Sequence, residues 1–156
     1  MSKTSRPVVL LVQPPDDGLD MYLEFFHHQR VPALAVSNAA DALTAAPDVA
    51  VIVTAIRLRG TTDGVGLILQ LRRDERTKDI PIVVLTACAF QTERERCQQA
   101  GADVFLAKPC LPDALLHEVR RLLASRHRGR RPAGTSGQGR GANDSLTDDI
   151  VVSRNT

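Results

Sequence analysis

Residues able to bind a small ion lie in four short segments of this chain, each directly after an apolar run. These segments are Gln13-Pro14-Pro15-Asp16-Asp17, Ala55 to Gly64, Thr86-Ala87 and Lys108-Pro109. Acidic side chains would suit a divalent cation, which binds through several anionic oxygens. A lysine ammonium beside a threonine hydroxyl would suit an oxyanion instead. Which chemistry is available depends on which of these residues the fold brings together.

Short β-branched runs alternate with longer amphipathic segments, a pattern that predicts strands and helices in turn. The predicted strands are Val8–Val12, Val31–Val36, Val49–Thr54, Ile80–Thr86 and Ala102–Leu106. The predicted helices are Gly18–Gln29, Asn38–Ala46, Asp63–Arg73, Ala89–Ala100 and Pro112–Ala124. This alternation predicts an α/β sheet with helices on both faces. Because ligands of such sheets bind outside the carboxyl ends of the strands, the four segments are expected at one edge.

Three residues carry helix-end signals. Asp17 and Asp63 each stand before a helical segment and are predicted to cap it through the side chain. Gly101 follows a charged helix and is predicted to end it in a left-handed conformation.

The four segments together resemble the receiver domains of two-component response regulators, over roughly residues 7–124. Thr86 and Phe105 match the family's switch threonine and switch aromatic, and Lys108-Pro109 matches its lysine followed by proline, a bond that is usually cis. The stretch from Thr54 to Gly60 resembles the phosphoacceptor strand and loop, where many receivers read Thr-Asp-Ile-Arg-Leu-Pro-Gly. The resemblance implies a flavodoxin-like three-layer sandwich, with a five-stranded parallel sheet of order 2-1-3-4-5 and five helices.

The chain departs from this family at the residues that perform its chemistry. Ala55 occupies the phosphoacceptor position, and a methyl group is not a nucleophile. Gln13 and Pro14 occupy the acidic pair, and together they offer one neutral side-chain oxygen to a metal that needs anionic ones. We therefore expect a non-enzymatic, degenerate receiver that takes no phosphoryl group and binds no Mg²⁺.

Loss of those carboxylates should also change the charge of the pocket. Lys108, with Arg57 and Arg59 close in sequence to Ala55, is expected to leave it neutral to positive. Such a pocket would admit a small anion such as sulfate or phosphate. Two alternatives stay open: Asp16 or Asp17 could restore a metal ligand through a shifted loop, and Asp16 or Asp63 could serve as an atypical phosphoacceptor.

A receiver without chemistry would act in signalling through protein partners, such as a histidine kinase or a downstream effector. The expected interface is formed by the fourth helix, the fifth strand and the fifth helix, through which family members commonly form dimers. Its charged residues are Arg94, Glu95, Asp103, Arg120 and Arg121. A solvated helix surface is the other interpretation of these charges.

The 156 residues predict one domain, with a short N-terminal tail over residues 1–6 and a basic C-terminal tail over residues 125–156. The tail carries six Arg and three Asp and little to bury, so it is expected to be disordered. Without aromatic residues to stack on bases, it would bind nucleic acid only weakly, and a nucleic-acid partner is not expected.

No apolar run is long enough to cross a bilayer, and the first residues lack the pattern of a signal peptide, so a cytoplasmic location is expected. Cys88, Cys97 and Cys110 lack the C-x-x-C spacing of zinc and redox sites. They are expected to be buried or half-buried thiols.

Overall fold

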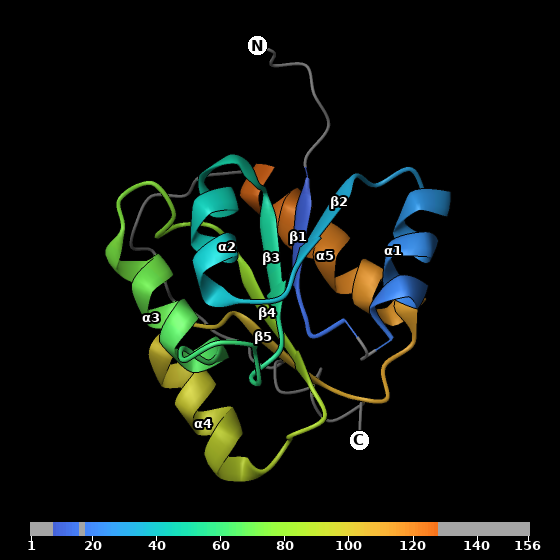
Figure 1. The fold of residues 1–156 in the computed structure, drawn as a ribbon. Coiled ribbons are helices and arrows are strands. Elements are labelled where there is room, and N and C mark those ends of the chain that lie inside the picture. Colours follow the sequence, from blue (N-terminus) through green and yellow to red (C-terminus); the bar gives the residue numbers. More distant parts are fainter. Residues whose placement is uncertain (1–7, 16–17, 128–156) are drawn as a thin grey trace.

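Five parallel strands form one sheet in the order β2-β1-β3-β4-β5, as predicted (Figure 1). The computed structural model describes residues 8–15 and 18–127. The strands are β1 (Val9–Val12), β2 (Ala33–Val36), β3 (Val51–Thr54), β4 (Ile82–Thr86) and β5 (Val104–Ala107). The helices are α1 (Leu19–His28), α2 (Ala39–Ala45), α3 (Gly64–Arg73), α4 (Gln91–Ala100) and α5 (Pro112–His127), with a 3₁₀ turn at Ala46–Asp48. The predicted α/β class and the five-helix count are therefore confirmed on the described residues.

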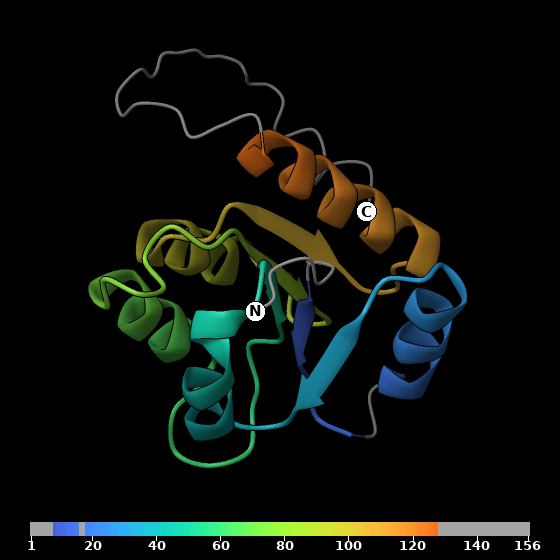
Figure 2. The same ribbon diagram turned by 90° about the horizontal axis from the view of Figure 1, so that it is seen from above.

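The helices form two layers, one on each face of the sheet (Figure 2). Alternate strand residues supply the two cores, because neighbouring side chains of a strand point to opposite faces. Leu10 and Ile52 pack with Leu67 and Leu71 of α3 in the core shared with α2 and α4. On the other face, Val9, Val53 and Leu85 pack with α1 and α5. Burial on both faces explains why the central strands are continuously apolar.

Several strand ends differ from the prediction because apolar residues there are bonded into turns. Val31 donates its N–H to the carbonyl of Phe26 at the end of α1, so β2 begins two residues later. Val49 donates to Ala46 and closes the 3₁₀ turn, which delays the start of β3. Ala102 donates to Cys97, so β5 begins at Val104. At its other end β5 continues to Ala107, one residue beyond the prediction, because Ala107 pairs with Thr86 of β4.

The helix ends are partly as predicted. Asp63 caps α3, with its side chain accepting from the N–H of Gly66 at 2.9 Å, and Gly101 ends α4 with φ 120°. The N-cap position of α1 is held by Gly18, with φ 76°, and Asp17, the predicted cap, lies outside the described residues. Helix α4 begins at Gln91 instead of Ala89, and α5 continues to His127, beyond the predicted Ala124.

The predictions for the two tails fall largely outside the described residues. The structure does not describe residues 1–6 and 128–156, so the disorder and the weak nucleic-acid binding expected of the C-terminal tail stay predictions. Within the described residues, no helix has both the length and the apolar character needed to cross a bilayer.

Candidate functional site

Gln13, directly after β1, is fully buried and reaches across to the loop after β5. Its N–H donates to the carbonyl of Val36 at 3.0 Å, which fixes the backbone beside β2. Its side-chain Oε1 accepts a hydrogen bond from Lys108 Nζ at 3.3 Å. The amide Nε2 is buried with no hydrogen-bond partner among the described residues. A neutral amide therefore contacts the ammonium group here.

Ala55 lies at the end of β3 with 4% of its surface exposed, so its methyl group is part of the core edge. The N–H of Ala55 donates to the carbonyl of Val12 at 2.9 Å. The neighbouring Thr54 is fully buried, and its hydroxyl donates to the carbonyl of Ala55 at 2.9 Å. That hydroxyl is therefore held against the backbone at the strand end.

The loop after Ala55 folds tightly back on the strand end. The N–H of Gly64 donates to the carbonyl of Ile56 at 2.7 Å. A Cβ atom built on Gly64 would lie 2.1 Å from the carbonyl oxygen of Ala55, so only glycine fits this close approach. Asp63 is engaged as the α3 cap, and one of its oxygens lies 3.8 Å from Arg96.

Thr86 and Lys108 meet where β4 and β5 end. The N–H of Lys108 donates to the carbonyl of Thr86 at 2.9 Å, continuing the ladder that pairs Thr86 with Ala107. The Thr86 hydroxyl oxygen accepts from the N–H of Cys88 at 3.0 Å, which shapes the loop after β4. The Lys108-Pro109 bond is cis, as the resemblance implied.

The sequence analysis did not predict two contacts around these residues. Lys108 Nζ lies 5.9 Å from the ring centroid of Tyr22, whose hydroxyl donates to the carbonyl of Cys110 at 2.7 Å. Phe105 is buried, and the guanidinium of Arg94 lies 5.0 Å from its ring centroid. A weak signal existed for the first, because Tyr22 is the single tyrosine of the chain and lies on the predicted apolar face of α1.

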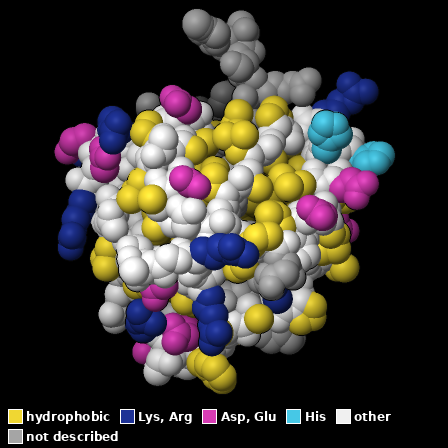
Figure 3. Space-filling view, in the orientation of Figure 1, with side chains coloured by type: hydrophobic (Ala, Val, Ile, Leu, Met, Phe, Trp, Pro, Cys, Tyr) yellow, Lys and Arg dark blue, Asp and Glu magenta, His cyan; other side chains and the backbone are white. Residues whose placement is uncertain are grey.

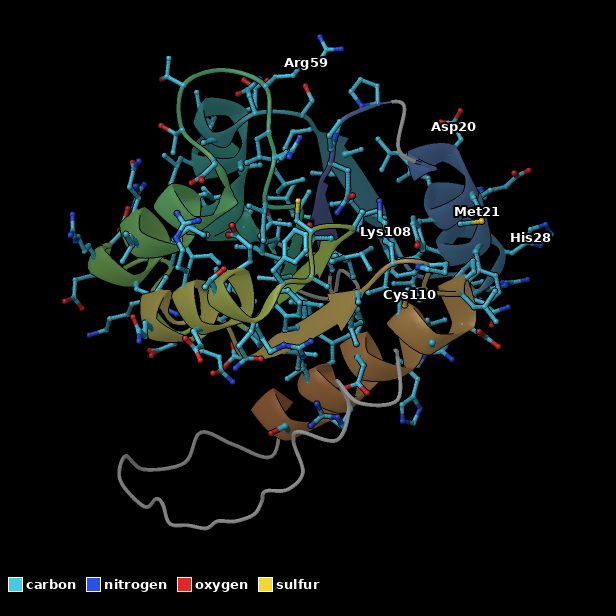
Figure 4. The ribbon with its side chains drawn as sticks, turned by 90° about the horizontal axis from the view of Figure 1, so that it is seen from below. Asp20, Met21, His28, Arg59, Lys108 and Cys110 are labelled. Atoms are coloured by element: carbon cyan, nitrogen blue, oxygen red, sulfur yellow. The ribbon has the colours of Figure 1, made fainter. Side chains whose placement is uncertain are left out.

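The two arginines proposed as anion contacts are both exposed. In Figure 4, which views the carboxyl ends of the strands, Arg59 points outward and away from Lys108. The backbone of Arg59 is tied to the start of α2 instead, since its N–H donates to the carbonyl of Ser37 at 3.1 Å. The structure thus brings Gln13, Thr86 and Lys108 together at this edge and leaves Arg59 outside the group.

Several charged residues of the predicted interface form contacts within the domain. Asp103 accepts from the N–H of Ile82 at 2.8 Å and pairs with Arg72 at 3.0 Å. Arg121 is paired with the buried Glu118 on α5. Glu95 and Arg120 are exposed, and Glu95 accepts a hydrogen bond from Gln91. Arg94, as above, covers Phe105.

The side chains after β1 and β3 offer little to a metal ion. Gln13 supplies one neutral side-chain oxygen, already engaged by Lys108, while Pro14 and Ala55 have no ligating atom in their side chains. Across the described ranges 8–15 and 18–127, no three His, Cys, Asp or Glu side chains are grouped as metal ligands would be. Asp16 and Asp17 lie outside these ranges, so their part in metal binding stays open.

The cysteines are unpaired thiols, as expected: Cys97 and Cys110 are buried and Cys88 is half-buried. Burial raises the pKa of the Cys97 thiol to about 11, and burial also raises the pKa of Cys110. These thiols are therefore protonated near neutral pH and do not suit nucleophilic chemistry.

Comparison with known proteins places this geometry in a wider group. The family model for the response regulator receiver domain matches residues 10–120. Response regulator Rre1 of Synechocystis is 44% identical over 62 residues, which cover 40% of this chain and 27% of that protein. The match thus spans about a quarter of the length of that curated relative.

Solved structures agree over more of the chain. A putative response regulator from Chloroflexus aurantiacus is 25% identical with a TM-score of 0.71, covering 77% of this chain and 99% of the other. The receiver domain of the sensor histidine kinase PA1611 from Pseudomonas aeruginosa is 26% identical, with a TM-score of 0.70 and the same two coverages. That second structure holds a magnesium ion in its active-site cleft.

Proposed function

Because this chain belongs to the response regulator receiver family, we propose that it is a signalling component that accepts no phosphoryl group and acts by binding other proteins. Receiver domains work with histidine kinases or effectors in two-component systems, and the present chain shares their fold. The proposal concerns what this receiver does in place of phosphoryl transfer.

Ala55 is the observation that carries the proposal. Its buried methyl group stands at the end of β3, where the family places the nucleophilic carboxylate. Phosphoryl transfer to a receiver needs an oxygen nucleophile in line with the leaving group. The nearest hydroxyl in sequence, on Thr54, is buried and bonded to the carbonyl of Ala55, so it supplies none.

Asp63 is a poor replacement acceptor. Its carboxylate already caps α3 through the N–H of Gly66, an interaction worth about 1 kcal/mol to the helix. Phosphorylation would turn the capping carboxylate oxygen into an acyl-phosphate carbonyl, which is a weaker hydrogen-bond acceptor for that N–H. Asp16, the other alternative acceptor, remains for the experiment below to test.

The polar contacts also argue against magnesium. A cation at this edge would compete with Lys108 for the single side-chain oxygen of Gln13. Magnesium in proteins is held by carboxylates in near-octahedral geometry, and Gln13, Pro14 and Ala55 supply none. We therefore infer that the magnesium site of the Pseudomonas relative is not retained here.

An anion is the ligand that suits this edge of the sheet better. Lys108 Nζ carries a positive charge, and the buried Nε2 of Gln13 is a donor without a partner among the described residues. An oxyanion accepting from both groups would satisfy a donor whose isolation costs about 1–3 kcal/mol. Weak binding of sulfate or phosphate is therefore part of the proposal, with Lys108 as its main contact.

For the partner surface, we propose the face formed by α4, β5 and α5. Phe90, at the start of α4, is 71% exposed and could anchor a partner, since aromatic side chains often dominate interfaces. Glu95 and Arg120 supply exposed charges of both signs on the same elements. A second copy of the chain or an effector protein would meet the same groups.

Incubation with acetyl phosphate and Mg²⁺, followed by intact-mass analysis, tests the proposal directly. The wild-type chain should gain no phosphoryl group, whereas the variant Q13D/P14D/A55D, which restores all three acids, should gain one. A hydroxylamine-sensitive phosphoryl adduct on the wild type would refute the silent-receiver proposal. If D63N or D16N then abolished that adduct, the atypical acceptor would be identified.

A further inference from the structure

The outer edge of β2 has no partner among the described residues. This strand ends the sheet and pairs with β1 alone. Leu34 is 50% exposed and Ala35 is exposed, although both are apolar. In the view of Figure 3, which looks toward this end of the sheet, apolar side chains gather between α1 and α2.

The hydrogen-bonding direction along β2 can be assigned residue by residue. The carbonyls of Pro32 and Val36 accept from Val9 and Gln13, so they face β1. Backbone groups of a strand alternate in direction, and therefore the N–H and C=O groups of Ala33 and Ala35 face the open edge. An open edge of this kind is a template for an added strand.

A groove of about 580 Å³ runs between α1 and this edge, and its rim is charged at one end. It is lined by Asp20, Leu23, Glu24, His27, His28, Val31 and Ala33. Asp20 lies in the first turn of α1, whereas His27 and His28 lie in the last. Because α1 runs antiparallel to the strands (Figure 1), the acids lie beside the carboxyl end of β2 and the imidazoles beside its start.

We propose that residues 150–153 of this same chain add to the open edge of β2 as a sixth, parallel strand. Ile150, Val151 and Val152 form a run of three β-branched residues, the type that favours strands. Added beside Leu34, these side chains would remove its exposed surface from water. Main-chain bonds to Ala33 and Ala35 would provide the pairing, as in other cases of strand addition.

Charge selects the parallel direction. Asp148 and Asp149 precede the apolar run, and Arg154 follows it. In the parallel arrangement the two aspartates meet the imidazoles at the start of β2, and the arginine meets the acidic end of the groove. The antiparallel arrangement would place aspartates against Asp20 and Glu24, a like-charge contact that is unfavourable.

The chain is long enough for this docking. Twenty-two residues, 128–149, connect the end of α5 to the apolar run, and they are rich in glycine. A flexible segment of that length has a typical end-to-end distance of about 25 Å. Helix α5, after which this segment begins, packs beside α1, and α1 lines the groove.

Amide hydrogen exchange in the full-length chain, followed by NMR, tests the proposal at single residues. The outward amides of Ala33 and Ala35 should exchange at least tenfold faster in one of the variants I150P and V151P than in the wild type. Only one of the two substitutions should have this effect, because neighbouring residues of a strand direct their N–H groups to opposite sides. Proline therefore removes a hydrogen bond to β2 at the one position whose N–H faces that strand. The amides of Leu34 and Val36, which face β1, should be unaffected. The control variant G137P changes the linker and should leave all four rates unchanged.

A charge exchange tests the direction of the added strand. R154D should weaken protection of Ala33 and Ala35, and adding D20R to it should restore protection. Equal exchange of the outward amides in the wild type and both proline variants would overturn the proposal. Protection that rises with protein concentration, together with a dimer in sedimentation, would overturn it too, because a second copy would then occupy the edge.

Discussion

Replacement of Gly64 by alanine tests the tight loop that places Ala55 at the edge of the sheet. The added methyl group would lie 2.1 Å from the carbonyl oxygen of Ala55 and 2.9 Å from the Cα of Ile56. Both neighbours are backbone atoms in hydrogen-bonded positions, since the N–H of Ala55 is bonded to Val12 and the carbonyl of Ile56 accepts from Gly64. The clash cannot be relieved by rotating a side chain.

The expected loss of stability follows from two opposing terms. Overpacking of a well-packed site costs typically 1–3 kcal/mol and more when backbone must shift. Replacing glycine by alanine in a helix gains up to about 1 kcal/mol, and less in its first turn. We therefore expect Gly64→Ala to lower the free energy of unfolding by about 2 kcal/mol, which corresponds to a fall in Tm of roughly 8 °C.

Gly66 provides the matched control, two residues further along the same helix. An added Cβ there meets Thr62 Cγ2 at 2.9 Å, and this methyl belongs to a side chain that can rotate away. Urea unfolding should show Gly66→Ala within about 0.5 kcal/mol of the wild type, as for most substitutions without a specific clash. Equal unfolding free energies for the two variants would refute the assigned backbone contact at Gly64.

Two further predictions concern groups away from the site. Arg72→Ala should lower the free energy of unfolding by about 2–4 kcal/mol, because Arg72 donates to the carbonyls of Gly101, Lys78 and Ile80 and pairs with Asp103. The control Arg73→Ala removes an exposed neighbour and should change the free energy of unfolding by less than about 0.5 kcal/mol. An equally small effect of both substitutions would contradict the assigned hydrogen bonds of Arg72. Iodoacetamide at pH 8 should modify Cys88 before Cys97, because burial raises the pKa of Cys97 to about 11 and so lowers its thiolate fraction. Peptide mapping of the folded chain measures the order of modification, and a faster reaction at Cys97 would contradict the prediction.

The α/β class and the two cores could be anticipated because the apolar runs are continuous and alternate with helical segments, whereas the strand order followed from the family resemblance. The strand ends could not, since Val31 and Val49 are as apolar as strand residues but donate their N–H groups into turns. A pattern of side-chain types does not encode which carbonyl a given N–H meets. The helix ends marked by Asp63 and Gly101 were easier, because a capping side chain and a positive φ each favour few residue types.

In the site, too, residue types and positions could be predicted, whereas contacts between distant residues could not. Ala55, Thr86 and Lys108 could be selected by their positions after strands, and the cis bond at Lys108-Pro109 followed from the resemblance. The contact between Tyr22 and Cys110 joins residues 88 positions apart, and no local pattern predicts it. The outward position of Arg59 could not be predicted from the sequence either, because it accompanies a backbone hydrogen bond between Arg59 and Ser37.

The geometry of this edge depends on residues other than the one that would perform the chemistry. Gly64 allows the close approach to Ala55, the backbone of Lys108 continues the β4–β5 ladder, and Thr86 shapes the following loop through Cys88. None of these contacts uses a side-chain oxygen at position 55. A methyl group there can therefore remove the nucleophile while leaving the surrounding backbone bonds intact. Similarity in fold to other receivers therefore does not decide whether this chain accepts a phosphoryl group, and the test must measure the covalent adduct.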